Sequence, residues 1–383
     1  MVIKSFKLLG LDEAVDRREE LRATGGPDVR RFEDYAHSDV TLPPIAYGGT
    51  DGVSDESVVR IVRSAHPSPV GRNPAFIVAN AMVRFRYGFV TAGNVLFRDS
   101  LWHAPFHAID GARVHDDGTV DLPDHEPDRT LSTATRLMSC HVDSYYHWLM
   151  DVLAQYNPAA QTVPDERRAD QPLTVLVPAL DQPFKRETME LLGVTARPHV
   201  EIAGDAAVAV EQLVMKPAVP MPHPRQMPNF DAIRSAALAG SSQSTPARVY
   251  ISRFDASNRR MENEAAVIEV MRTFGFAVVL LSGRSVADQV RLFAGATHIV
   301  APHGAGLSNL LFCRAGTRVL ELVMDGYLQW SFRHICAVRR LTYGCVFGRI
   351  TPPRSNWIHD NNWTLPLDGL WTALRDPAFG AVN

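Results

Sequence analysis

The sequence predicts an α/β fold with two facing Rossmann-like domains and an N-terminal extension that contains β-strands. From about residue 131 onward, strand-like and helix-like segments alternate, which is typical of a parallel sheet covered by helices on both faces. A proline-rich stretch at 217–228 interrupts this alternation, so a domain boundary is expected within 217–247. The 383 residues, of which 46% are hydrophobic and 21% charged, are enough for two or three domains with real cores.

The second half shows the alternation most clearly. Four compact apolar segments are predicted strands, and they start 21 to 29 residues apart: 247–252, 276–281, 297–301 and 318–323. Helices are predicted between them over 262–274, 285–294 and 305–312. Gly275 is expected to cap the first of these helices. This spacing is that of βα units in a doubly wound sheet.

The first half is less regular. A helix is expected over 12–23, hairpins over 75–101, and an acidic, turn-rich connection over 110–130. The remaining predicted elements are strands at 137–142, 173–178, 199–203 and 212–216 and helices over 145–156 and 183–192. The expected parts of the chain are an extension (1–130), a first Rossmann-like domain (131–240), a second one (241–350), and a tail (351–383) that packs back on the first domain.

Composition and charge argue against several classes of protein. The 39 basic and 42 acidic residues give a net charge of −3 without a long basic run, which disfavours a nucleic-acid partner. A mean hydropathy of −0.09 and the lack of a long apolar stretch argue against a spanning helix, and the first residues lack the apolar core of a signal peptide. The chain is expected to be soluble. Its four cysteines have no ligand spacing, which predicts reduced thiols and no zinc site.

A glycine-containing loop at 302–309 follows the third predicted strand of the second half. Gly304, Ala305 and Gly306 would bring backbone N–H groups close to a ligand where a helix begins, which is a natural seat for a diphosphate. His303 could add a further donor. The alternative is a tight turn that needs glycine for its backbone angles, with His303 capping the sheet.

Three arginines follow the predicted strand 247–252: Arg253, Arg259 and Arg260. The carboxyl end of such a strand is where ligands bind in open α/β sheets, and guanidinium groups suit phosphate oxygens. The alternative is a solvated loop whose arginines pair with nearby acidic residues. Because a glycine-containing loop that could bind an anion follows another strand of the same sheet, we favour the interpretation that these arginines bind phosphate.

Two further acidic positions stand out. On a helix over 145–156, His147 and Asp151 would share one face, where a carboxylate could orient an imidazole that acts as a base. An ordinary surface pair is the alternative. Glu321 lies inside an apolar strand, where it could accept both hydroxyls of a ribose or reach solvent at the strand end. The sequence lacks GxGxxG, a P-loop, GxSxG, HExxH and an Asp-x-Asp pair.

Together these segments resemble glycosyltransferase family 61. The resemblance rests on the segment Tyr145–Asp151, on the residues 289–321 with their HGAG loop, and on a group after the predicted strand 247–252. That group comprises Ser252, Arg253, Arg259, Arg260, Asn263 and Glu264. The motifs occur in the expected order over about 135–325.

The resemblance implies a GT-B fold and an inverting transfer of sugar from a nucleotide-sugar, a UDP-sugar by preference, without a metal or other cofactor. The second Rossmann-like domain would hold the donor: arginines and the HGAG loop with Asn309 at the diphosphate, Glu321 at the ribose, and Ser252, Asn263 and Glu264 in support. The first domain would bind a carbohydrate acceptor, with Asp151 or His147 as the base; Asp151 is preferred, with His147 as its partner or as a donor contact. The expected setting is capsular or cell-surface polysaccharide synthesis in the bacterial cytoplasm, peripheral to membrane-bound machinery.

Two other classes of function remain open at this stage. One is a Rossmann-type oxidoreductase or epimerase, although the missing third glycine disfavours NAD. The other is a carbohydrate-binding or assembly protein without catalytic activity.

Overall fold

The computed structural model describes residues 2–33, 38–48, 53, 56–70, 74–101, 104–156, 173–217, 221, 223–241, 244–327, 329–350 and 355–380. Parts of the proline-rich stretch 217–228 and of the predicted tail lie outside these residues. The chain divides into two compact units, Met1–Ser38 with Gly71–Asn229 and Asp39–Val70 with Phe230–Asn383. Residues 39–70, which the sequence assigned to the extension, therefore pack within the second unit.

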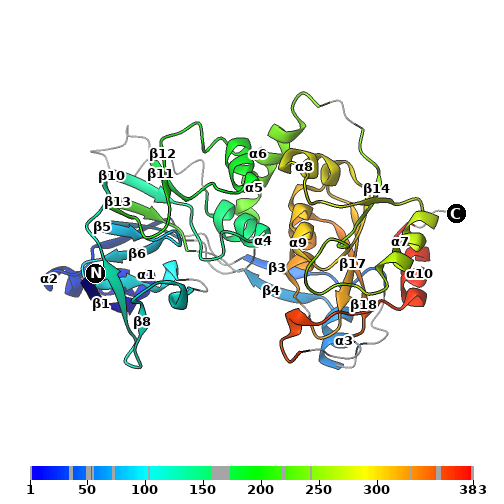
Figure 1. Cartoon of the computed structure of the whole chain (residues 1–383), viewed down its shortest axis with the longest axis horizontal. Coiled ribbons are helices and arrows are strands. Elements are labelled where there is room, and N and C mark those ends of the chain that lie inside the picture. Colours follow the sequence, from blue (N-terminus) through cyan, green and yellow to red (C-terminus); the bar gives the residue numbers. More distant parts are fainter. Residues whose placement is uncertain are drawn as a thin grey trace. The chain divides into compact units, whose positions relative to one another are not determined.

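A large mixed sheet forms the first unit (Figure 1). Its strands within the described residues run in the order β12-β11-β10-β13-β5-β6-β7-β1-β9-β8. Strand β2 lies outside this order and pairs with the first half of β5, on the edge whose second half pairs with β6. Their bounds are β1 (Val2–Leu9), β2 (Val29–Glu33), β5 (Ala75–Arg84), β6 (Phe89–Ala92), β7 (Val95–Phe97), β8 (Arg113–Val114), β9 (Thr119–Asp124), β10 (Arg129–Arg136), β11 (Thr174–Pro178), β12 (His199–Ile202) and β13 (Ala207–Met215).

The predicted parallel strands of the first half are present, but they do not form a separate Rossmann-like sheet. Strands β12, β11, β10 and β13 are parallel, and β13 then pairs antiparallel with β5 over nearly its whole length. The sheet is therefore continuous from the supposed extension into the supposed first domain. Its apolar face packs against residues such as Leu11 and Ala14 of α1, and both of these side chains are fully buried.

Two local predictions for the first unit are wrong. Residues 137–142 are not a strand; their apolar side chains are buried in irregular backbone, while the preceding threonine-rich β10 makes the ladder. The connection 110–130 contains β8 and β9, because Val120 and Leu122 alternate with polar residues and pair with β1. The hairpins at 75–101 are confirmed as β5, β6 and β7.

The helices of the first unit are short. Their bounds are α1 (Leu11–Asp16), α2 (Arg18–Ala23), α4 (Tyr145–His147), α5 (Pro183–Leu191), a π-helical turn η3 (Trp148–Val152), and the 3-10 turns η1 (Arg98–Ser100), η2 (Phe106–Ala108), η4 (Leu153–Gln155) and η5 (Pro224–Gln226). The expected regular helix over 145–156 is thus α-helical for one turn and then passes through a π-turn and a 3-10 turn. Helix α6 (Met227–Leu238) begins in the first unit and continues into the second.

A parallel sheet in the order β15-β14-β16-β17-β18 forms the centre of the second unit, which confirms the doubly wound pattern (Figure 1). Helices α7 and α10 lie to one side of it, and α8 and α9 lie to the other. The bounds are β14 (Arg248–Ile251), β15 (Ala277–Val279), β16 (His298–Pro302), β17 (Arg318–Met324), β18 (Thr342–Gly348), α7 (Glu264–Thr273), α8 (Val286–Gly295), α9 (Ser331–Arg339), α10 (Leu367–Arg375) and the 3-10 helices η6 (Ala305–Phe312) and η7 (Ile358–Asp360). Gly275 caps α7 as expected, with φ of 72° and its N–H donating to Arg272.

Two segments from outside the predicted second domain complete this unit. Residues 39–70 contribute the pair β3 (Ser38–Leu42) and β4 (His66–Val70) and helix α3 (Glu56–Arg63). The described part of the tail, 355–380, packs on the second unit and not on the first: α10 contributes to the same apolar cluster as α7. The expectation for the tail was therefore wrong.

The architecture is a mixed α/β fold with one large mixed sheet and one parallel sheet. The GT-B arrangement of two facing halves stays a prediction. No helix within the described residues is long and apolar enough to cross a membrane. The four cysteines are buried and unpaired, in agreement with the expected reduced thiols.

Candidate active site

A cavity of about 340 Å³ lies at the carboxyl ends of β14 and β16 in the second unit. It is lined by residues 251–253, 255–258, 281–282, 301–302 and 304–307. This edge of an open parallel sheet is where ligands bind, because the strands end there and the following loops diverge.

Arg253 is the cation of this cavity. Its Nη1 donates to the carbonyl oxygen of His303 at 2.9 Å and its Nη2 to that of Asn258 at 3.2 Å. Its Nε is buried, and no described residue forms a hydrogen bond with it. Burial, and then the like charge of Arg259, lower the pKa of this guanidinium. An anion in the cavity would be attracted to this guanidinium and would relieve the repulsion between the two arginines.

Glu264 fixes the backbone that carries Arg253. The carboxylate is 3% exposed, and its Oε1 accepts hydrogen bonds from the hydroxyl of Ser252 at 2.9 Å and the backbone N–H of Arg253 at 2.8 Å. The hydroxyl of Tyr250 donates to the same oxygen at 3.0 Å. Burial and the charge of Glu264 raise the pKa of Tyr250 well above its ordinary value, so this hydroxyl remains a donor. Ser252 and Glu264 therefore fix the position of Arg253, while their expected role in supporting a donor stays a prediction.

Gly304 is required by the position of Arg253. A Cβ atom on Gly304 would lie 1.9 Å from Nη1 of Arg253, so no other residue fits while the guanidinium stays in place. Gly306 is similarly close to the Leu281 side chain, at 2.8 Å. The 3-10 helix η6 begins at Ala305, and the first backbone N–H groups of a helix have no partner within it. The loop thus combines a guanidinium with free backbone donors.

The ring of His303 takes a different role from the one expected. Its Nδ1 lies 2.5 Å from Oε1 of Glu321, and the hydroxyl of Tyr343 donates to Oε2 of the same carboxylate at 2.7 Å. Glu321 is 1% exposed, and both of its oxygens are engaged by protein groups, so the structure does not support its direct contact with a ribose. The ring of His303 also packs on Tyr327. What His303 offers Arg253 is its carbonyl oxygen.

Arg259 lies in a cluster that includes the C-terminal segment. Its Nη1 is 2.9 Å from Nδ1 of His359, and its guanidinium stacks over the ring of Tyr327, 4.6 Å from the ring centroid. Arg259 has a positive φ of 49°, which is rare for a side chain of this size. Burial, and then the charge of Arg259, lower the pKa of His359, which favours the neutral ring that can accept from the guanidinium. The ring of Trp357 stacks on His359 and is exposed.

Three further predicted site residues also lie outside the lining of the cavity. Arg260 is exposed on the loop. Asn263 exchanges two hydrogen bonds with the backbone of Leu365, which ties the C-terminal segment to the start of α7. Asn309 is fully buried and donates to the carbonyl oxygen of Gly306 and to Gln289, so it stabilises the glycine loop from behind.

His147 and Asp151 form a pair in the first unit, as predicted. Nδ1 of His147 lies 2.8 Å from Oδ2 of Asp151, and the hydroxyl of Ser139 donates to the same oxygen at 3.4 Å. The side chain of Asp151 is 3% exposed and that of His147 is 30% exposed. A buried carboxylate that receives the proton of Nδ1 leaves Nε2 as the basic atom of an accessible imidazole. This arrangement favours His147 over Asp151 as a base.

Residues 145–320 match the family model described as Glycosyltransferase 61. The resemblance to glycosyltransferase family 61 is confirmed. The match supports a glycosyltransferase activity in general. The matched region begins at the helix of His147 and ends one residue before Glu321, so it includes both the His147–Asp151 pair and the cavity of Arg253. No curated protein matches the chain.

Three residues that contact predicted site residues were not predicted from the sequence. Tyr327, Tyr343 and His359 lie beyond the matched region, in segments where no expected motif occurs. Tyr343 could have been found only by recognising β18 as a further strand beside β17. Among the described residues, no group of three or more His, Cys, Asp or Glu side chains has an arrangement that would hold a metal ion.

Proposed function

We propose that this chain transfers a sugar, with inversion and without a metal ion, from a UDP-sugar to a carbohydrate acceptor. The observation that carries the proposal is the half-buried guanidinium of Arg253, which lines a cavity beside the start of η6, where the first backbone N–H groups have no partner within the helix. A leaving diphosphate gains negative charge in the transition state, and such preorganised donors stabilise that charge. The family match supports the reaction class.

The transfer is a single displacement. The acceptor hydroxyl oxygen attacks the anomeric carbon, the bond from that carbon to the diphosphate oxygen breaks, and the nucleoside diphosphate leaves. The proton of the hydroxyl passes to Nε2 of His147, while Asp151 holds the ring and stabilises the imidazolium. This step requires His147 to face the anomeric carbon during transfer. Cell-surface or capsular polysaccharide is the proposed acceptor class, on the basis of the resemblance alone, with a cytoplasmic setting.

The first test is binding of UDP, GDP, CMP and NAD by thermal shift, with and without EDTA. A ligand that binds only the folded state raises the melting temperature by mass action. We expect a rise with UDP that EDTA does not change. A rise with GDP or CMP alone would change the donor, and a response only to NAD would favour the oxidoreductase. Loss of the UDP response in EDTA would contradict metal-free binding.

The base is tested by His147→Ala. A general base contributes about 10²–10⁴-fold to a rate, so we expect a loss of that order in transfer with unchanged UDP affinity. Asp151→Asn, which keeps the hydrogen bond but removes the charge, should lose less. His107→Ala, which removes an exposed imidazole elsewhere in the first unit, is the control. If Asp151→Asn abolishes transfer while His147→Ala retains it, the carboxylate is the base.

A further inference from the structure

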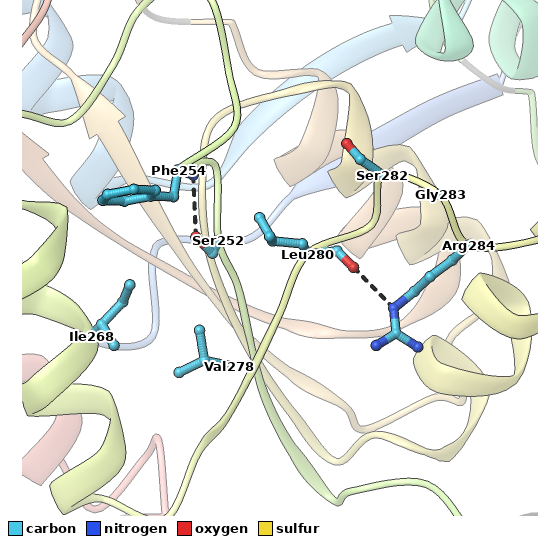
Figure 2. Close-up of a pocket in the computed structure, with 8 residues that line it drawn as sticks. All are labelled: Ser252, Phe254, Ile268, Val278, Leu280, Ser282, Gly283 and Arg284. Carbon is cyan, nitrogen blue, oxygen red and sulfur yellow. Dashed lines mark hydrogen bonds between the residues drawn. The ribbon is translucent and has the colours of Figure 1, made fainter.

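A second hollow adjoins the cavity of Arg253 (Figure 2). It has a volume of about 510 Å³, and Ser252 and Ser282 line both spaces. Its walls are apolar side chains from the loop after β14, from α7 and from β15 with the loop that follows: Phe254, Ile268, Val278 and Leu280. A ligand held at Arg253 can therefore extend directly into this hollow.

The apolar side chains of this hollow are unusually accessible. Phe254 is 59% exposed and Leu280 is 43% exposed, and both are among the few large apolar side chains that the described residues leave in solvent. Scattered exposed apolar residues need no explanation, but two that line one hollow beside an anion cavity indicate a ligand surface. The exposed ring of Phe254 offers a flat face on which a second planar ring can stack.

The wall of the hollow is already ordered by the same network that holds Arg253. The carboxylate of Glu264 accepts from the hydroxyl of Ser252, and the oxygen of that hydroxyl accepts from the backbone N–H of Phe254 at 3.1 Å. On the opposite rim, Nε of Arg284 donates to the carbonyl oxygen of Leu280 at 2.9 Å, as drawn in Figure 2. Both rims are thus fixed before any ligand arrives, which lowers the entropic cost of binding.

The chemistry of the lining distinguishes between the parts of a nucleotide-sugar. The lining residues include no Asp, Glu, Asn or Gln, the side chains that commonly accept from or donate to several sugar hydroxyls. They do include an aromatic face, aliphatic walls, and the polar groups of Ser282 and Arg284 at the rim. A flat heteroaromatic ring with polar edges fits such a lining.

We propose that this hollow is the nucleobase subsite of the donor, with the base stacked on Phe254 while the diphosphate lies against Arg253. This inference rests on the proposed nucleotide-sugar donor and adds the position of the base. Phe254 and Leu280 then determine how tightly the nucleoside is held, and Arg253 determines how tightly the phosphates are held.

The test compares UDP with inorganic pyrophosphate by isothermal titration calorimetry on the full chain. Phe254→Ala should weaken UDP binding by at least about 10-fold, since stacking of a base on an aromatic ring contributes on this scale. Pyrophosphate, which lacks a base, should bind as to the unchanged protein. Leu280→Ser should have the same selective effect. Leu238→Ala, which also removes an exposed apolar side chain of the second unit, is the matched control.

A second variant gives a direct signal. Phe254→Trp keeps an aromatic face, so it should retain UDP affinity, and its emission should change on addition of UDP but not of pyrophosphate. UDP affinity that is unchanged in both Phe254→Ala and Leu280→Ser would overturn the subsite. An equal loss of UDP and pyrophosphate binding in Phe254→Ala would also overturn it, because the variant would then act through the anion cavity.

The two proposals can fail separately. If the unchanged protein binds pyrophosphate and UDP equally, the hollow does not recognise a base. The proposal that the cavity of Arg253 binds a diphosphate is then retained. If it binds no nucleoside diphosphate at all, the donor proposal fails together with this one.

Discussion

Gly304 has only a hydrogen atom where other residues have a side chain, and the position of the Arg253 guanidinium in the cavity depends on this. The guanidinium of Arg253 occupies the space that a Cβ on this residue would need. The φ of Gly304 is 174°, which is extended backbone that any residue adopts, so the requirement for glycine is one of space and not of backbone strain.

Gly304→Ala should therefore displace the guanidinium while the fold persists. We expect UDP affinity to fall by at least about 10-fold, equivalent to about 1.4 kcal/mol, measured by calorimetry. Gly10→Ala is the control, because a Cβ there would meet nothing closer than 3.8 Å. Equal UDP affinity in the two variants would show that Arg253 does not hold the phosphates.

The site residues differ in how far the sequence could predict them. Arg253 and Gly304 follow strands with clear apolar patterns, so their positions at the carboxyl ends of those strands were predictable, as was the positive charge at residue 253. The partner of Glu321 was not, because Tyr343 belongs to a strand whose preceding helix carries buried polar residues and shows no simple stripe. The burial of Asp151 was not predictable either, since a π-turn replaces the regular helix there.

Among the elements, the C-terminal segment 355–365 supports the loop that carries Arg259 and lies outside the region matched by the family model. The indole N–H of Trp363 donates to the carbonyl oxygen of Arg259 at 3.0 Å, and His359 accepts from the guanidinium of the same residue. A loop strained by a positive φ at Arg259 is thus held by side chains more than 95 residues later in the chain.

His359 makes this support dependent on pH. Its pKa is lowered in the folded state, so the unfolded chain takes up a proton first as pH falls below about 6.5. The stabilisation from neutral His359 is therefore complete above that pH and is lost progressively on acidification. The free energy of unfolding of His359→Ala should lie below that of the unchanged protein at pH 7.5, and the difference should shrink at pH 5.5. A difference that grows on acidification, in urea titrations at the two pH values, would contradict this role.

Elements that form through local βα units were predictable, and those that depend on distant pairing were not. The strands and helices of 247–323 follow one another with regular apolar periods, and each packs on its neighbour in sequence. The antiparallel pair of β5 and β13 joins segments more than 120 residues apart, and no feature of either segment predicts that it pairs with the other. The first unit was therefore divided at a point where its sheet is continuous.

For the whole molecule, the segment 39–70 makes the second unit discontinuous in sequence. Tyr47 is 2% exposed within the cluster of α7 and α10, and its hydroxyl oxygen lies 2.7 and 2.8 Å from the carbonyl oxygens of Val319 and Thr342, which share its single proton as acceptors. Gly344 is needed because a Cβ there would lie 2.1 Å from the ring of Tyr47. The early segment is thus a structural part of the second unit.

Tyr47→Phe keeps the ring and removes the buried donor. The carbonyl oxygens of Val319 and Thr342 then lose the one proton that they share, and the loss of a donor to a buried acceptor costs about 1–3 kcal/mol. We expect the free energy of unfolding to fall by that amount, followed by tryptophan fluorescence in urea. Tyr87→Phe, in the first unit, is the control and should change it by less than about 0.5 kcal/mol. Equal effects of the two variants would contradict the role given to Tyr47.

The early position of this segment also has a consequence for synthesis. Tyr47 leaves the ribosome about 300 residues before Tyr343, which at about 5–20 residues per second is a delay of roughly 15–60 s. During that interval Leu42 and Tyr47, both almost fully buried in the finished protein, have no completed core to enter. The nascent chain must therefore protect an apolar segment until its last third has been translated, which makes the yield of active protein sensitive to elongation rate and to chaperone supply.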